Sequence, residues 1–450
     1  MNTSTGRYAG LRDFLLIWFG QMTSGIGSRL SSFALGIWVL RTTGSTTQFA
    51  LIFVAMAVPA LLIAPFAGAL VDRWDRRRIM LCCDLVSASA QLVLAALLMH
   101  SQLAIWHIYV CVGATALANA FHGPAYASSI PLLVPHGQLS RVNGLVQTGG
   151  AIAQVAGPLL AGVLVSLVSL PGVLLIDALS FLAAFVAMLA ARIPRPPRSQ
   201  DSEGQSLWRE AATGWRYVRE RHSLFGLLLV FGTCNFLFGI AAITITPLVL
   251  SMADPALLGV QMSIGGAGLL LGGVLMAASG GMKKRINGVL GFSLLAGLAL
   301  AAHGLAPSFV LVTAAGFVFF LTLPVISASN DSLWQSKVPP GLQGRCFAIQ
   351  RVLSEAAMPV GYCLAGPLAE HVFEPLLMPG GALAGSIGQL IGTGAGRGMG
   401  LMFIVLGLAM SLVALLAYSI PALRRADELP DAWAPSEADP PAMEGLRQPA

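Results

Sequence analysis

Residues 68 to 80 read Gly68-Ala-Leu-Val-Asp-Arg-Trp-Asp-Arg-Arg-Arg-Ile-Met80, which places four arginines and two aspartates between two long apolar segments. A connection this short and this charged lies on one face of a membrane, because charged side chains are costly in hydrocarbon. An excess of Lys and Arg marks the cytoplasmic side of membrane proteins. The stretch therefore predicts a cytoplasmic loop, and it fixes the direction of the segments on either side.

The composition is that of a polytopic membrane protein. Of the 450 residues, 56% are hydrophobic and 10% are charged, and the mean hydropathy is +0.77. A soluble domain carries about 25% charged residues. The net charge of +6 could suggest a nucleic-acid partner, but the basic residues lie in short loops, as topology requires. The six cysteines show no paired framework, and we interpret them as reduced packing residues.

Windows of about 20 mostly apolar residues, the length that spans a bilayer, predict twelve membrane helices. With both termini in the cytoplasm, all but three of the 26 Lys and Arg residues fall on the cytoplasmic side. The exceptions are Arg41 and Arg397 outside and Arg29 within a span, and this bias supports the layout. The windows cover residues 13–38, 47–70, 79–99, 104–130, 141–168, 172–192, 223–250, 256–280, 286–305, 308–330, 346–370 and 399–421.

The pattern divides the chain into two six-helix halves, at 1–192 and 223–421. Between them, the segment 193–222 starts with a Pro-Arg linker and continues with Leu207, Ala211, Trp215 and Val218 at helical spacing. This spacing predicts an amphipathic helix on the inner membrane surface. Residues 422–450 are rich in proline and acids without apolar periodicity, which predicts a disordered cytoplasmic tail.

The two halves are repeats of one another. Residues 134–141 match residues 338–345, Arg76–Arg78 match Lys283–Arg285, and Gly157-Pro158 match Gly366-Pro367, all at nearly equal offsets. Near-equal offsets on equivalent segments indicate duplication. Because six is an even number, both copies have the same orientation in the membrane.

The opening stretch resembles the signature loop of the major facilitator superfamily, Gly-x-x-x-Asp-Arg-x-Gly-Arg-(Arg/Lys). The matching positions are Gly68, Asp72, Arg73, Arg76 and Arg77. Asp75 stands where the wider family has glycine, and this variant resembles the branch with macrolide-efflux proteins and the enterobactin exporter. The resemblance implies an all-α fold of twelve transmembrane helices, arranged as two parallel six-helix repeats.

Drug-antiporter members of this family also carry a Gly-Pro signature in the fifth helix. Gly150, Gly157, Pro158 and Gly162 are similar to it. We expect these residues, with Gly366 and Pro367, to permit close packing and bending of helices. The basic residue that the same relatives carry in the fourth helix is absent here, since no Lys or Arg lies between Arg78 and Arg141.

The loop predicts an inner gate that holds in one state and opens in another. Asp72 can pair with the positive N-terminal end of a helix of the opposite half, and the eleventh helix starts near Arg345. Arg73 needs a carboxylate, and Asp84 is the nearest candidate. The alternative is that these charges only set the topology and solvate a turn. Positive-inside counting gives aspartate little weight, and this favours the gate.

Glu355 is the candidate for proton coupling or substrate binding. It lies about 15 Å beyond Arg345 along the eleventh helix, at 1.5 Å per residue, near the middle of the membrane. A carboxylate at this depth binds a proton or a partner. The alternative is a fixed ion pair with Arg351, one turn earlier on the same face, and the sequence leaves both open.

Two further charges fall inside predicted spans. Asp177 in the sixth helix is either a structural polar cap near the outer end or a coupling residue. Arg29 in the first helix could bind an anionic substrate group, balance Glu355, or act as a structural partner for polar neighbours such as Gln21. Buried intramembrane charges usually mark transport pathways.

The predicted function is secondary active export of amphipathic small molecules (a drug, siderophore or natural product) by proton antiport with alternating access. No phosphate-binding Gly-Lys loop, metal-ligand cluster or nucleophile-base pattern is present, so we expect no enzyme, no ATP and no cofactor besides the proton gradient. We expect a monomer in the bacterial cytoplasmic membrane, with a small-molecule substrate and lipid as its partners. An importer or lysophospholipid flippase, or a non-transporting sensor, remains an alternative.

Overall fold

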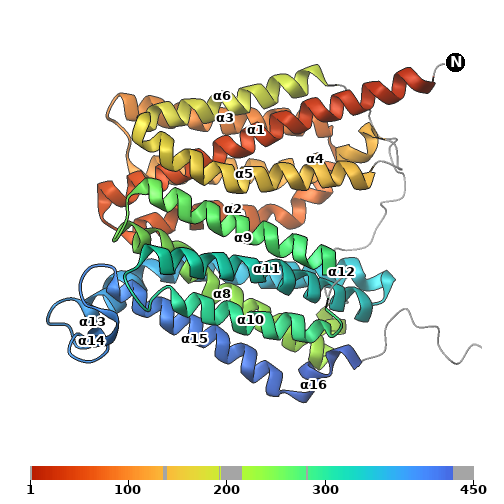
Figure 1. Ribbon diagram of the computed structural model, residues 1–450. Coiled ribbons are helices and arrows are strands. Elements are labelled where there is room, and N and C mark those ends of the chain that lie inside the picture. Colours follow the sequence, from red (N-terminus) through yellow and green to blue (C-terminus); the bar gives the residue numbers. More distant parts are fainter. Residues whose placement is uncertain (1–2, 135–138, 192, 194–214, 280–281, 429–450) are drawn as a thin grey trace, which may run out of the picture.

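The computed structural model describes the chain except residues 1–2, 135–138, 192, 194–214, 280–281 and 429–450 (Figure 1). It contains twelve long helices and no strand in the described part, which confirms the predicted all-α fold and the number of spans. Nine of these helices include a stretch long and apolar enough to cross a membrane. The twelve long helices are α1 (Thr3–Thr43), α2 (Thr46–Arg73), α3 (Arg76–Met99), α4 (Ile105–Leu133), α5 (Leu139–Leu167), α6 (Leu170–Ala190), α8 (His222–Leu250), α9 (Pro255–Ser279), α10 (Arg285–Ala302), α11 (Phe309–Lys337), α12 (Pro340–Pro367) and α15 (Arg397–Ser419).

The helices form two halves that lie side by side, α1 to α6 and α8 to α15 (Figure 1). In the first half α1 packs on α5, α2 on α4, and α3 on α6. In the second half the corresponding pairs are α8 with α12, α9 with α11, and α10 with α15. The same three pairings in the same order are what a duplicated six-helix unit produces, and they agree with the repeat seen in the sequence.

Short polar residues start several of these helices. Ser45 accepts a hydrogen bond from the Gln48 amide at the start of α2, and Ser308 accepts one from the Leu311 amide at the start of α11. Such caps satisfy backbone donors that a helix leaves unpaired. They fix where each span begins at the membrane surface.

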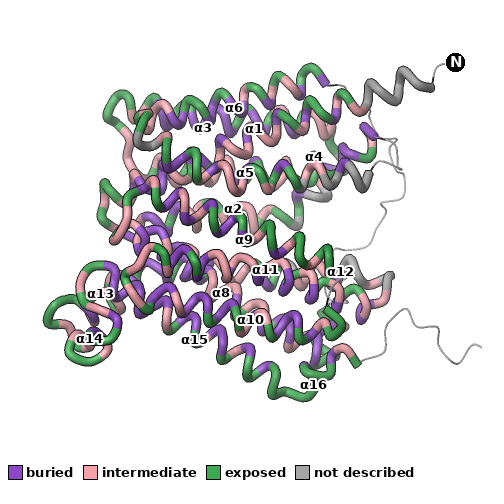
Figure 2. Tube along the Cα trace, in the orientation of Figure 1, coloured by how far each residue is buried: buried purple, intermediate pink, exposed green. Residues whose placement is uncertain are grey.

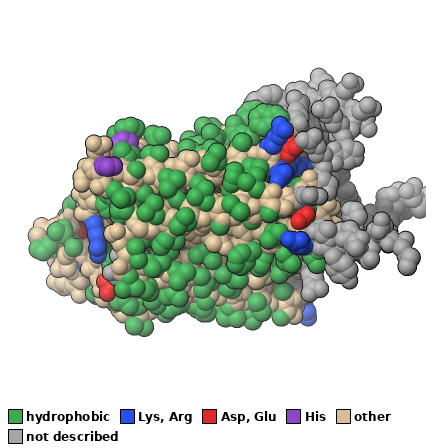
Figure 3. Space-filling model, turned by 90° about the horizontal axis from the view of Figure 1, so that it is seen from above, with side chains coloured by type: hydrophobic (Ala, Val, Ile, Leu, Met, Phe, Trp, Pro, Cys, Tyr) green, Lys and Arg blue, Asp and Glu red, His purple; other side chains and the backbone are tan. Residues whose placement is uncertain are grey.

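The bundle has a basic end and an opposite end. The basic end carries the connections next to Arg76–Arg78, Lys283–Arg285 and Lys337, and the opposite end carries the turns at 44–45, 100–104 and 251–254. On the face drawn in Figure 3, charged side chains gather near the two ends and hydrophobic side chains cover the middle. Burial follows the same plan, since outward faces of the helices are exposed although apolar (Figure 2). Leu62, Leu179 and Val186 are examples, each more than 60% exposed, as expected for surfaces that contact lipid.

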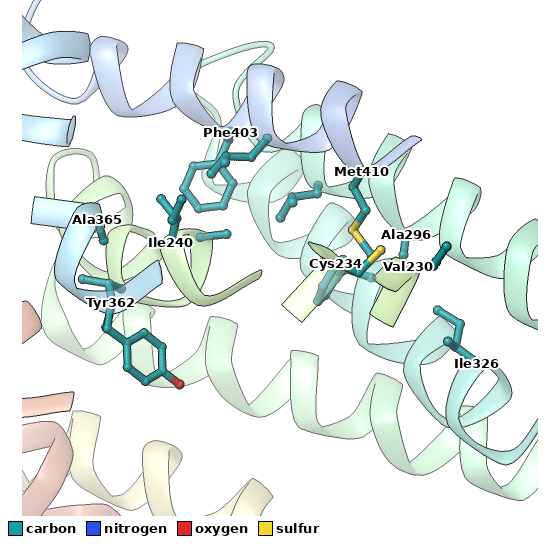
Figure 4. Packing of buried hydrophobic residues seen from close by; sticks show 14 of the residues in the cluster. Val230, Cys234, Ile240, Ala296, Ile326, Tyr362, Ala365, Phe403 and Met410 are labelled. Carbon is teal, nitrogen blue, oxygen red and sulfur yellow. The ribbon is translucent and has the colours of Figure 1, made fainter. Parts of the chain in front are cut away.

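The largest buried cluster extends from the second half into the first. Ile240, Phe403 and Ala365 belong to it, and Tyr362 of α12 points away from them toward the first half (Figure 4). There the Tyr362 ring meets Phe53 of α2, with 5.8 Å between ring centroids. The contact lies toward the opposite end of both helices, so apolar packing joins the halves there.

Glycines bring α5 and α9 together across the same boundary. A Cβ atom at Gly259 would lie 3.1 Å from the Gly162 Cα and 2.5 Å from the Pro158 carbonyl oxygen. Nearby, the Ser263 hydroxyl donates to the Val155 carbonyl at 2.8 Å. Small residues allow membrane helices to pack backbone to backbone, as expected for the Gly-Pro signature.

Several boundaries differ from the sequence predictions. The first residues of the predicted tail are structured, since Pro421–Arg424 form α16 and Ala426–Glu428 form a 3₁₀ turn in which Asp427 accepts a hydrogen bond from the Ile286 amide at 3.0 Å. This hydrogen bond and the burial of Leu423 hold this segment. Residues 429–450 lie outside the described part. Most of the segment predicted as an amphipathic helix also lies outside the described part. Its residues 215–220 are described, and they are helical. All six cysteines are free.

The segment 371–398, which had no predicted fold, is ordered. It continues α12 through a π-helical turn (Leu368–Phe373) and α13 (Glu374–Leu377), and then forms α14 (Ile387–Ile391). Glu374 ties its two ends together, because its carboxylate accepts hydrogen bonds from the Gly396 and Gly398 amides at 2.9 and 3.3 Å. The Arg397 guanidinium donates a hydrogen bond to the Gly304 carbonyl at 2.6 Å, which attaches this segment to the end of α10.

Replacing Gly259 with valine should disrupt the α5–α9 contact. We expect a loss of about 1–3 kcal/mol, the range for overpacking, measured as a lower thermal unfolding midpoint of the purified protein in detergent. Gly273→Val is the matched control on the same helix, because a Cβ atom at Gly273 meets no atom within 4 Å. Equal midpoints for the two variants would contradict the proposed role of this contact.

Candidate functional site

At the opposite end, the carboxylate of Glu370 joins the two halves. This residue follows α12 in the second half, and its partners stand at the start of α2 in the first half. Oε1 accepts hydrogen bonds from the Ser45 hydroxyl and the Thr47 amide, both at 3.0 Å, and Oε2 accepts one from the Thr47 hydroxyl at 2.8 Å. The site therefore supplies a carboxylate to a helix N-terminus, where backbone N–H groups and the helix dipole favour negative charge.

The backbone around this contact leaves no space. A Cβ atom at Gly366 would overlap the Thr47 backbone, so the repeat-derived Gly366-Pro367 stands where α12 touches α2. Beyond it, Phe33 and Ile37 of α1 join a cluster with Val249 and Leu258 of the second half. Hydrogen bonds, close backbone packing and apolar contacts thus all close the bundle at the opposite end.

At the basic end, the described residues of the signature loop bind within the first half. Asp75 caps α3 through a hydrogen bond from the Arg78 amide to its Oδ1 at 3.2 Å. Arg76 donates to the Ser128 carbonyl at 2.7 Å, in the last turns of α4. Arg77 donates to the carbonyls of Met188 and Leu189 at the end of α6, at 3.2 and 2.7 Å.

These arginines neutralise the negative ends of two helix dipoles, which is a role the sequence alone did not reveal. The side chains of Asp72, Arg73 and Arg345 lie outside the described part of the structure, as does Gly68 beyond its place in α2. The gate hypothesis for these residues therefore stays a prediction.

Asp84, the predicted partner of Arg73, is buried and has a different described neighbour. Its Oδ1 lies 3.6 Å from Nε2 of His122 on α4. The sequence search missed His122, because a lone histidine in an apolar helix gives no local signal of a partner on another helix.

Glu355 lines an open cavity of about 480 Å³ inside the second half. The cavity lies between α8, α11 and α12, in the part of the bundle nearer to the basic end. Glu355 is exposed to it. The side chain of Arg351 is not described, so the predicted ion pair between the two residues is not tested.

A second carboxylate, Asp331 of α11, lines the same cavity. The Gln350 side chain lies within hydrogen-bonding reach of it, and the Asn235 amide donates to the Ser354 carbonyl at 3.0 Å. The sequence search missed Asp331 because the predicted span ended at residue 330. The helix continues to Lys337, which places Asp331 within a membrane helix. The lining consists of Phe231, Asn235, Ser327, Asn330, Asp331, Gln335, Phe347, Gln350, Ser354 and Glu355.

Arg29 is exposed in the middle of α1, and its stem packs on α5. A Cβ atom at Gly157 would lie 2.7 Å from the Arg29 Cβ, so Gly157 makes room for the arginine. Among the described side chains, no carboxylate forms an ion pair with Arg29. Gly150, the first residue of the predicted motif, meets no atom within 4 Å at its Cβ position.

Asp177 belongs to a buried network between α6, α1 and α3. The Ser31 hydroxyl donates to Asp177 Oδ2 in a short hydrogen bond, and the Ser180 hydroxyl lies 3.3 Å from Oδ1. Gln91 of α3 donates to the Ser31 oxygen at 3.4 Å. Ser31 and Gln91 line a small cavity of about 140 Å³. These contacts join α6 to α1 and α3 through a buried polar cluster, and Asp177 is fully buried in it rather than placed at the interface as a polar cap.

Changing Glu370 to glutamine should increase the fraction of molecules in which the two halves are separated at the opposite end. Hydrogen bonds to a charged group contribute about 1.5–3 kcal/mol, so we expect the population with separated halves to rise about tenfold or more. Spin labels at Thr42→Cys and at the exposed Val310→Cys of α11, with the exposed Cys82 and Cys363 changed to serine, should show longer distances by pulsed electron paramagnetic resonance.

Glu374→Gln is the matched control, because its described hydrogen bonds stay within the second half. An unchanged distance distribution in Glu370→Gln would show that the carboxylate does not hold the halves together.

Comparison with known proteins agrees with this geometry. A sequence profile described as the Major Facilitator Superfamily matches residues 17–362. The chain is similar to macrolide efflux protein A of Enterococcus faecalis, at 30% identity over 310 residues that cover 68% of this chain and 95% of the relative. The Streptococcus pyogenes protein of that name is 29% identical, over 80% of this chain and 90% of its own length. The multidrug efflux pump Tap of Mycobacterium tuberculosis (strain ATCC 25618 / H37Rv) is 25% identical, over 93% and 95%.

Solved structures of transporters share the fold. A bacterial homolog to the human lysosomal transporter Spinster, in an inward-facing and unoccupied conformation, has a TM-score of 0.70 at 15% identity, covering 95% of this chain and 99% of that one. The nucleoside transporter NupG has a TM-score of 0.66 at 12% identity, covering 90% and 98%. Since the profile matches most of a chain that folds into twelve membrane helices, the protein belongs to the Major Facilitator Superfamily and is a membrane transporter rather than an enzyme.

Proposed function

We propose that this transporter exports amphipathic cations by alternating access, driven by proton entry. The observation that carries the proposal is the cavity of the second half, where Asp331 and Glu355 stand among amide and aromatic side chains. Two carboxylates in one membrane cavity favour a ligand with a positive charge, because a bound cation offsets the cost of negative charge at this depth.

The rest of the lining fits a large, partly apolar ligand. Phe231 and Phe347 offer aromatic surface, which packs on apolar groups and attracts a cation to the ring face. Asn235, Asn330 and Gln350 add hydrogen-bonding groups. A few polar groups in an otherwise apolar wall are typical of small-molecule sites. The names of the relatives, which describe macrolide efflux and multidrug efflux, agree with a substrate of this kind.

The basic end faces the cytoplasm in this proposal, because Lys and Arg mark that side. The described contacts between the halves lie toward the opposite end. They are at Glu370, at Tyr362 and where α5 meets α9 at Gly162 and Gly259. A substrate would then enter the cavity from the cytoplasm. Release outside requires the halves to separate at Glu370 and to meet at the signature loop, as rocking of two rigid repeats produces.

Removing the carboxylates should weaken cation binding. In sealed vesicles with the purified protein and an imposed pH gradient, we expect Glu355→Gln and Asp331→Asn each to raise the KM for ethidium or erythromycin about tenfold. Loss of one charge-assisted contact, about 1.5–3 kcal/mol, accounts for that factor. The double variant should bind neither compound, and an uncharged substrate should keep its KM.

The proton flux in the same vesicles separates the alternatives. If Glu355→Gln abolishes gradient-driven transport but leaves ethidium binding unchanged, Glu355 carries the proton and not the substrate. If compounds cross without proton flux in the wild type, a uniporter or flippase replaces the antiporter. If no compound moves or binds, the export proposal fails.

A further inference from the structure

A buried acid–base pair lies in the first half, away from the cavity of the second half. Asp84 Oδ1 of α3 and His122 Nε2 of α4 are 3.6 Å apart, and their side chains are 3% and 12% exposed. This separation is within ion-pair range but too long for a hydrogen bond. Asp84 lies eight residues into α3, about 12 Å along the helix, so the pair is inside the membrane region.

Several buried polar atoms at this place make no hydrogen bond of ordinary geometry, although the Gln21 amide lies beside the Asp84 carboxylate. They are Asp84 Oδ2, His122 Nε2, the Tyr126 hydroxyl and Gln21 Nε2. Gln21 of α1 faces the Asp84 carboxylate, and the Tyr126 ring centroid lies 6.3 Å from that of His122. Unpaired buried polar atoms are costly. Their convergence from three helices indicates a site whose contacts change with bound protons or helix position.

Among the described side chains, no third charged group forms an ion pair with Asp84 or His122. Tyr126 and the Cys83 thiol, which donates to the Ala118 carbonyl, are the nearest titratable neighbours. Arg76 reaches the Ser128 carbonyl at the end of α4. Asp177 of α6 lies nearer to the opposite end, where its carboxylate accepts hydrogen bonds from the Ser31 and Ser180 hydroxyls. The charged residues of α2 are Asp72 and Arg73, and the charged residue of α5 is Arg141. The structure does not describe these three side chains.

We infer that the Asp84–His122 pair is the proton-binding site through which a proton gradient drives transport; the inference rests on the proposed function. Imidazole exchanges protons between about pH 5 and 8, and two interacting groups titrate as a pair. One proton enters from outside and binds the Asp84 carboxylate beside the neutral imidazole, which turns the negatively charged pair into a neutral one. The same proton leaves to the cytoplasm and restores the negative charge. α4 has no Lys or Arg, so its basic side chains are His122 and, at the helix start, His107.

The pair is placed to act on the transport path. Its three helices, α1, α3 and α4, hold the first half together, and α1 also carries the exposed Arg29. A change in charge between α3 and α4 alters which of the unpaired atoms of Gln21 and Tyr126 are satisfied. Protonation can thereby bias the position of α1 against α5 and the second half, while the substrate stays at Asp331 and Glu355.

The first experiment measures proton binding without transport. Infrared difference spectra of the full-length protein between pH 5 and 8 should show the band of a protonated carboxyl group that is absent in Asp84→Asn. In His122→Gln the midpoint of that band should move by about one pH unit, since two groups that share a proton titrate as a pair and removing one shifts the titration of the other by about this amount or more. A band that persists unchanged in both variants would overturn the site.

The second experiment measures coupling in vesicles. Asp84→Asn and His122→Gln should lower pH-gradient-driven ethidium transport at least tenfold, while ethidium binding and gradient-free exchange stay within twofold of the wild type. His303→Gln is the matched control, since this buried imidazole contacts the Ala299 carbonyl and the Phe403 ring. The control should keep gradient-driven transport.

Each outcome separates the inference from the proposed function. Gradient-driven transport that survives in both variants overturns the coupling role of the pair and leaves the antiporter intact. A wild type that lacks gradient-driven transport overturns the coupling role and the antiporter together, while the infrared band still reports on proton binding. If Asp84→Asn does not fold, His122→Gln and Tyr126→Phe, which removes only the unpaired hydroxyl, carry the same test with a smaller expected loss for Tyr126→Phe.

Discussion

One carboxylate at a helix N-terminus joins the two halves at the opposite end, beside close backbone packing and apolar contacts. Glu370 accepts hydrogen bonds from Ser45 and Thr47, so a charge on the second half satisfies the unpaired donors of α2 in the first half. The contact is strong because both the hydrogen bonds and the helix dipole favour it. It is also breakable, because each partner can be hydrated when the ends separate. The alternating access that we propose needs both properties.

The signature loop has a complementary role at the basic end. Arg76 and Arg77 bind the last carbonyls of α4 and α6, and Asp75 caps α3. These contacts hold the first half together as one body. Rigidity within each half and reversible contacts between the halves are what the proposed rocking motion requires.

The polar groups inside the membrane region are divided between the halves. The second half carries Asp331 and Glu355 around an open cavity, whereas the first half carries Asp84 with His122 and Asp177 with Ser31 in buried clusters. An exposed carboxylate in a cavity can bind a ligand, and a buried pair can hold a proton. Placing them in different halves would let the relative position of the halves link the two events.

The sequence by itself determined the topology, because the two signals behind it are local. Apolar windows mark the spans and the Lys and Arg residues mark one face, so the twelve helices and the duplicated halves followed from the chain read in order. The sequence also identified Glu355 and Asp177 as charges within spans. Only the tertiary structure decided which side chains meet, since Glu370 and Thr47 are 323 positions apart and His122 lies 38 positions from Asp84. Such pairs depend on which helices pack and on the rotation of each helix about its axis, and no local pattern encodes either.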